Sequence, residues 1–267
     1  MPVTDELLLV FIAGLVTGLA TGLGALPFFL VREVTDRWLV VLWGVATGVL
    51  FSASTVGLLA EGVADGSFGH VLVGCLAGVG FVFVADRIIA NWNVPAQQDP
   101  TADYRMVVLA VGVLTLHSIP EGIAVGVAFA DIGHETEVVL GDVAVSTLAV
   151  YMTLAVSIIN IPEGLAIAIP LIAYGMNRWK VVGWAVFSGL PQPLGAVLAY
   201  QLATSIEALL PMSFGFAAGA LLYLVFSEYL PAGIANGTDL PRKGRPELVC
   251  GVAVGLVAML ALLVMIE

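Results

Sequence analysis

Two short matching motifs each place a glutamate inside a long apolar segment. Glu121 lies in the run His117–Ala124, and Glu163 lies in the run Ile159–Ala166, at an offset of 42 residues (163 minus 121). Each glutamate follows a proline and precedes a glycine. An isolated carboxylate in hydrocarbon costs about 3 kcal/mol or more, and no Lys or Arg is expected at this depth. The pair therefore favours a bound cation or protons.

The side chains beside the two glutamates suit a divalent transition metal. His117 stands one helical turn before Glu121, and Asn160 stands three residues before Glu163, so each pair shares a helix face. Ser118 adds an oxygen. One imidazole, two carboxylates and neutral oxygens suit zinc, iron(II), manganese(II) or cobalt(II) better than alkali ions or copper(I). We expect a transported metal ion, with zinc favoured over iron and manganese, and no prosthetic group.

The composition indicates that the elements carrying these motifs are transmembrane helices. Hydrophobic residues make up 60% of the 267 positions and charged residues 11%, against about 25% charged in soluble domains. Apolar stretches of about 20 residues, enough to cross a bilayer, recur along the chain. We predict an all-α, single-domain transporter (1–267) with eight spans, at 7–31, 38–61, 69–90, 105–130, 143–174, 181–204, 212–235 and 247–266.

The basic residues predict the orientation of these spans. All nine Lys and Arg residues fall in or next to the odd-numbered loops, and none falls in the even-numbered loops. The positive-inside rule then places the odd-numbered loops in the cytoplasm and both termini outside the cell membrane. The spans holding Glu121 and Glu163 run in opposite directions, so their motifs are related by a pseudo-two-fold axis in the membrane plane.

The net charge and the spacing of the glycines indicate which binding partners the protein can have. The net charge of −11 argues against nucleic acid and leaves the lipid bilayer and a cation as partners. Glycines recur at four-residue spacing, which favours close packing within the chain, with a homodimer face as the alternative. Two more carboxylates lie in apolar spans: Glu228 is expected on the cation pathway, and Asp86 is expected to pair with a basic neighbour.

The sequence resembles the ZIP (Zrt-, Irt-like protein) metal transporters, in particular their prokaryotic branch. The resemblance rests on the two motifs, on eight spans with both termini outside, and on Ser188–Gly195 in the sixth span. It implies metal movement toward the cytoplasm through a site between the fourth and fifth spans, in a 3+2+3 inverted-repeat arrangement. It also implies a ligand set of His117, Ser118, Glu121, Asn160, Glu163 and Gln192, with Glu228 on the exit route.

Three positions depart from the family pattern. Ser118 stands where Asn is usual, Ile159 where His or Gln is usual, and Gln192 where Glu is usual. These changes remove donors and negative charge. We therefore expect a single metal ion, held mainly by His117, Glu121 and Glu163.

Two rival functions fit this sequence less well than metal transport. An intramembrane zinc hydrolase needs a ligand set such as His-Glu-x-x-His, which this sequence lacks, so no enzyme activity is expected. A proton-coupled carrier of a small organic substrate could use the paired glutamates as a proton relay. His117 and the absence of a substrate-anchoring arginine count against that carrier.

Overall fold

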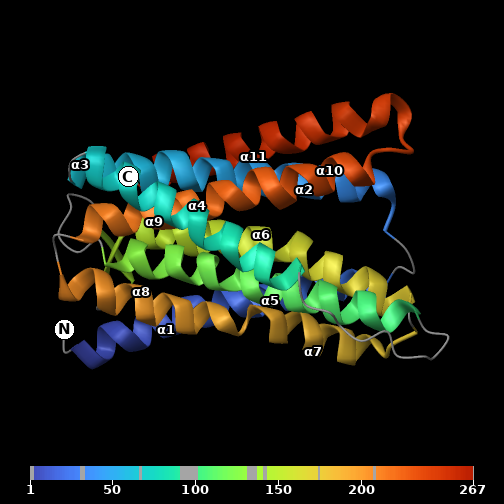
Figure 1. Cartoon of the computed structure of the whole chain (residues 1–267), viewed down its shortest axis with the longest axis horizontal. Helices are drawn as coiled ribbons and strands as arrows, with labels where there is room; N and C mark the ends of the chain where they lie inside the picture. The colour runs from blue at the N-terminus through green and yellow to red at the C-terminus, as the bar shows by residue number, and fades with distance from the viewer. Residues whose placement is uncertain are drawn as a thin grey trace.

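The computed structural model describes residues 3–30, 34–65, 68–90, 102–130, 137–140, 143–173, 175–206 and 209–266. Its long helices lie side by side along the longest axis of the molecule (Figure 1). Helices α5 (Ala102–Phe129) and α6 (Thr147–Ala173) run through the middle of the bundle. Since these two helices carry the glutamate motifs, the motifs lie in its interior.

The other elements surround this pair. Along one side of the view lie α2, α10 and α11, and along the other lie α1, α7 and α8 (Figure 1). The remaining bounds are α1 Val3–Ala20, η1 Thr21–Phe29, α2 Asp36–Ser52, η2 Ala53–Leu59, α3 Ala60–Asp65, α4 Phe68–Ala90, β1 Glu137–Leu140, β2 Val143–Ser146, α7 Arg178–Gly189, α8 Pro191–Ser205, α9 Leu210–Leu224, η4 Val225–Tyr229, α10 Leu230–Asn236, η5 Pro241–Gly244 and α11 Arg245–Ile266.

The helices confirm a polytopic membrane protein. Within the described residues, 7 helical segments are long and apolar enough to cross a membrane: Asp5–Phe29, Asp36–Ala64, Phe68–Ile88, Thr147–Ile169, Arg178–Ser205, Leu210–Asn236 and Pro241–Met265. They match seven of the predicted spans. The 28-residue α5 covers the predicted fourth span. The side of the membrane on which each terminus lies, and the inverted-repeat relation, stay predictions.

One departure from an all-α chain is a short antiparallel hairpin of β1 and β2. Glu137 pairs with Ser146, and Leu140 pairs with Val143. The predicted fifth span was therefore wrong at its start, because residues 143–146 form a strand and the helix begins at Thr147. The Ser146 hydroxyl accepts a hydrogen bond from the Ala149 N–H at 3.0 Å, which caps the first turn of α6.

Several spans are not uniform α-helices. The predicted sixth span breaks at Leu190 into α7 and α8, where Pro191 opens the new helix because proline has no N–H to continue the earlier ladder. The second and seventh spans contain π-helical segments, η2 and η4. In η4 the Leu230 N–H bonds to the Val225 carbonyl, five residues back, just before Pro231. Such π turns occur frequently at functional sites, and η4 carries Glu228.

The glycine rows are used for helix packing within one chain. Gly44 and Gly48 of α2 meet α11, and a Cβ added at Gly44 would lie 3.0 Å from the Gly251 Cα. Gly74 and Gly78 of α4 meet α9 in the same way. Close backbone approach of this kind is the usual role of small residues in membrane helices. A homodimer would therefore need a different surface.

Candidate metal centre

The six residues predicted as metal ligands are all buried. Their exposed fractions are 4% for His117, 2% for Ser118, 0% for Glu121, 0% for Asn160, 2% for Glu163 and 0% for Gln192. They come from the middle of α5, the middle of α6 and the start of α8. The fold therefore brings residues that are 75 positions apart in sequence (192 minus 117) into one interior region.

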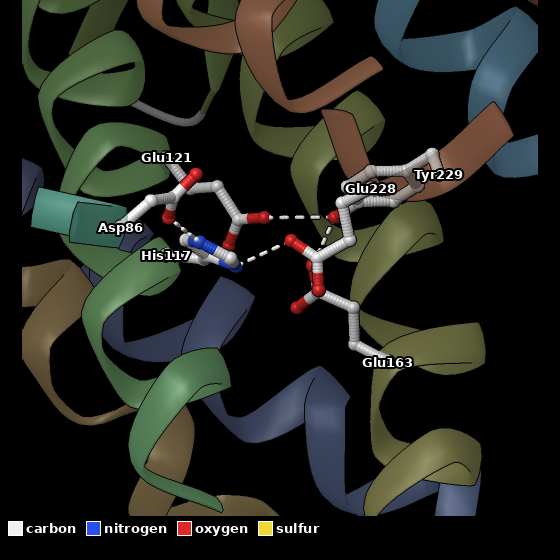
Figure 2. Close-up of polar contacts among 6 residues, drawn as sticks. All are labelled: Asp86, His117, Glu121, Glu163, Glu228 and Tyr229. Carbon is white, nitrogen blue, oxygen red and sulfur yellow. Dashed lines mark hydrogen bonds and ion pairs between the residues drawn. The ribbon is translucent and has the colours of Figure 1, made fainter. Parts of the chain in front are cut away.

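The two glutamates are joined by a tyrosine. The Tyr229 hydroxyl lies 3.1 Å from Glu121 Oε1 and also hydrogen-bonds to Glu163 Oε1. Figure 2 shows both carboxylates directed toward this hydroxyl, which comes from η4. Among the ion pairs of the described residues, none joins Glu121 or Glu163 to Lys or Arg. The prediction of two facing carboxylates without a Lys or Arg partner therefore agrees with this geometry.

Two amide side chains lie on the other side of Glu121. Gln192 Nε2 donates to Glu121 Oε2 at 2.6 Å and to Asn160 Oδ1 at 3.1 Å. Asn160 Nδ2 donates to Gln192 Oε1 at 3.1 Å and to the Thr17 carbonyl at 2.6 Å. The amide pair is therefore reciprocal, and Gln192 presents a hydrogen-bond donor to Glu121 instead of a negative charge.

His117 lies between two carboxylates. Its Nε2 is 3.0 Å from Asp86 Oδ1, and its Nδ1 is 2.5 Å from Glu228 Oε2; these contacts are drawn in Figure 2. Asp86 was expected to pair with a basic neighbour, and its partner is the imidazole of His117 and not the adjacent Arg87. The guanidinium of Arg87 lies over the Phe83 ring instead, 5.1 Å from its centroid, because successive residues of a helix point in different directions.

Ser118 uses its hydroxyl on a helix contact. Its Oγ donates to the Ser188 carbonyl of α7 at 2.8 Å. This bond ties α5 to the end of α7, close to the break before Pro191. The hydroxyl proton is thus directed at the backbone and not at the two glutamates.

Sequence reasoning did not assign Tyr229 or Asp86 to the site. The sequence carried a signal for both, since each is a polar side chain inside a predicted apolar span. Asp86 was dismissed because an arginine follows it directly. Tyr229 was not considered, and a neutral phenol in a span is a weaker signal than a carboxylate because its burial costs less.

Exposure differs between the two ends of this polar cluster. Beyond Glu121 on α5, toward the end of the bundle with the hairpin, Val125 and Ala128 are fully buried, as are Met152 and Ala155 of α6. In the other direction, the side chains of Glu228 and Asp86 are 22% and 29% exposed. The interior is therefore closed on the side of the hairpin, and the carboxylates of Glu228 and Asp86 lie toward the opposite end of the bundle, where they are partly exposed.

No metal-ligand geometry is assembled in this arrangement. In the part of the chain that the structure describes, no three His, Cys, Asp or Glu side chains are grouped so that they could hold a metal ion. The physical reason is that the donor atoms face one another or Tyr229 and Gln192. A cation must displace some of these contacts to bind.

The fold and the buried imidazole and carboxylates define a helical, multi-pass membrane protein with the polar interior of a cation transporter. The family described as "ZIP Zinc transporter" matches residues 96–263. The chain belongs to this family.

Individual relatives extend the match to almost the whole chain. A provisionally named zinc transporter of Arabidopsis thaliana is 36% identical over 250 residues, covering 93% of this chain and 37% of that protein. The zinc transporter ZupT of Corynebacterium glutamicum is 28% identical, covering 92% of this chain and 96% of the relative. The zinc transporter ZIPB of Bordetella bronchiseptica is 29% identical, covering 93% and 77%.

Proposed function

We propose that this protein carries a divalent metal cation, with zinc as the favoured ion, across the cell membrane toward the cytoplasm. The observation that carries the proposal is the buried pair Glu121 and Glu163, which face each other without a Lys or Arg partner in the described ion pairs. Two carboxylates in a desolvated interior are best stabilised by a cation. The zinc-transporter names of the relatives support zinc as that cation.

The pathway that we propose follows the chain of polar side chains. The cation is held between α5 and α6 by Glu121, Glu163 and His117, with oxygens of the amide pair beside it. It then passes Glu228 and Asp86, whose partial exposure marks the direction of release. With odd-numbered loops in the cytoplasm, this direction is inward, because Asp86 lies close to the C-terminal end of α4.

The alternative of a small organic substrate gains no support from the apolar cavity that the described residues form between α5, α8 and α9. A cavity of about 400 Å³ is lined by apolar side chains of α5, α8 and α9, such as Ile119, Leu198 and Phe216. Neither glutamate lines it. A proton-coupled carrier would need its substrate next to the proton-binding groups, so this cavity does not support that function.

The test of the function is metal uptake by cells that express the protein. Labelled zinc should accumulate above the level of matched vector cells, saturably, and an excess of Mg²⁺ should not compete. Purified protein in liposomes, with a zinc-sensitive dye inside, should show the same uptake. A drop in cellular zinc would mean that transport runs out of the cell, opposite to the proposed direction. Liposomes that take up neither zinc, iron(II) nor manganese(II) would contradict the proposed function itself.

Asp86→Asn is expected to lower the initial rate of zinc uptake about tenfold, in the range seen when a carboxylate that orients a ligating histidine is removed. The reason is that Asp86 holds the Nε2 side of His117 at 3.0 Å. Arg87→Gln is the matched control, since Arg87 is the neighbouring charge but lies over Phe83. Equal losses in both variants, or none in Asp86→Asn, would contradict a role for Asp86 through His117.

A further inference from the structure

Tyr229 occupies the space between the two glutamates from a third element. Its side chain is fully buried, and its hydroxyl contacts Glu121 of α5 and Glu163 of α6. A phenol has one proton and one oxygen, so a single neutral group joins both carboxylates. This is also the space that a cation bridging the two carboxylates would need (Figure 2).

The position of this hydroxyl is set by packing that does not involve the glutamates. The Tyr229 ring meets Trp43 of α2 edge to face, with centroids 5.6 Å apart and planes at 82°. Trp43 itself is only 6% exposed. The backbone of Tyr229 ends the π segment η4, two residues before Pro231. The aromatic contact and the π turn therefore hold the hydroxyl in place from outside the α5–α6 pair.

We propose that Tyr229 is a positioning residue that clamps Glu121 and Glu163 together in the cation-free protein and is displaced when a divalent cation binds. The inference rests on the proposed function. The single proton of the hydroxyl is shared between the two carboxylates, and this shared contact stabilises the empty site, so the cation must replace it. The clamp therefore lowers the affinity for the cation and speeds its release. Without the clamp, the buried pair of negative charges would bind a divalent cation tightly. With it, the affinity is low enough for the cation to be released during transport.

The direct test is Tyr229→Phe, which removes the hydroxyl and keeps the ring against Trp43. We expect the Kd for zinc, measured in detergent against a competing chelator, to fall about tenfold, the effect of losing one hydrogen bond to a charged group. In liposomes the KM should fall with it. The maximal rate should also fall, because release becomes slower. A tyrosine that only supports the fold would not produce tighter binding together with slower turnover.

Tyr151→Phe is the matched control. Tyr151 is also fully buried, but its hydroxyl contacts Ser52 at 3.1 Å and not the glutamates. Its removal should leave the Kd and KM for zinc unchanged. The same change in both variants would mean that any buried phenol affects binding, which would overturn the inference.

Two other results would also overturn the clamp. Weaker zinc binding in Tyr229→Phe would make the hydroxyl a ligand, and an unchanged Kd would make it a bystander. If this variant does not fold, the clamp can be tested by infrared difference spectra of the unaltered protein with ring-labelled tyrosine. Addition of zinc should shift a tyrosine C–O band. The absence of a shift would contradict displacement of the Tyr229 hydroxyl. An unaltered protein that neither binds nor moves zinc would instead refute the proposed function.

Discussion

Glu163→Gln is expected to reduce zinc uptake at least about 100-fold while the protein stays folded, equal to about 2.8 kcal/mol at 1.4 kcal/mol per tenfold. Glutamine keeps the size of the side chain and can still bond to the Tyr229 hydroxyl, so packing around α6 is preserved. What is lost is one of two buried negative charges that face each other across that hydroxyl. The remaining carboxylate cannot balance a divalent cation in a desolvated interior.

The measurement is initial zinc uptake into liposomes, normalised to protein that elutes as a single species in detergent. Glu247→Gln is the control for loss of one negative charge. Glu247 lies at the start of α11 and pairs with Arg37 at 3.6 Å, away from the site. Its substitution should leave the rate within about twofold, since this partly exposed ion pair does not involve the site residues and pairs near the surface contribute about 1 kcal/mol or less. Full uptake by a folded Glu163→Gln protein would refute the site assignment.

Gly78→Ala and Gly80→Ala are expected to change stability in opposite directions, although the two positions are neighbours on α4. A Cβ at Gly78 would lie 2.9 Å from the Ala220 N of α9, closer than real Cβ atoms come, whereas a Cβ at Gly80 meets nothing within 4 Å. Both residues are helical with negative φ. Overpacking at Gly78 should cost about 1–3 kcal/mol, and alanine at Gly80 should gain about 0.5–1 kcal/mol in helix propensity.

Thermal unfolding in detergent, followed by loss of the monodisperse peak, compares the two variants directly. The Gly78→Ala protein should unfold at a lower temperature than the unaltered protein, and the Gly80→Ala protein at a higher one. Gly78→Ala should also reduce transport, because α4 carries Asp86 and α9 leads into Glu228. Equal stability of the two variants would mean that α4 and α9 are not packed backbone to backbone.

Much of this protein could be predicted because the relevant signals are local in sequence. A transmembrane span can be recognised from the apolar composition of its own residues, since a transmembrane helix satisfies its backbone hydrogen bonds internally. Seven of the predicted spans were confirmed as long apolar helices, and α5 covers the fourth. The fifth was wrong at its first residues, where a strand precedes Thr147. In the same way, Glu121, Glu163 and His117 were recognisable because polar groups inside such spans are costly.

The contacts of the site could not be predicted, because they depend on helices that meet only after folding. Asp86 lies beside Arg87 in sequence, yet it pairs with His117, 31 residues away. Gln192 was recognised as a changed ligand position, but its bonds to Glu121 and Asn160 require the break at Leu190 and the packing of α8 on α5. Tyr229 reaches the glutamates through a π turn that no periodicity indicates.

The sequence by itself determined where the long apolar helices lie and that two of them carry a glutamate, and it predicted a divalent cation as the partner of this pair. These conclusions follow from the cost of placing each group in hydrocarbon, which depends on the group and its own helix. The tertiary structure alone decided which atoms face the carboxylates. Hydrogen-bond partners are chosen by helix packing, and that packing placed a tyrosine hydroxyl between Glu121 and Glu163.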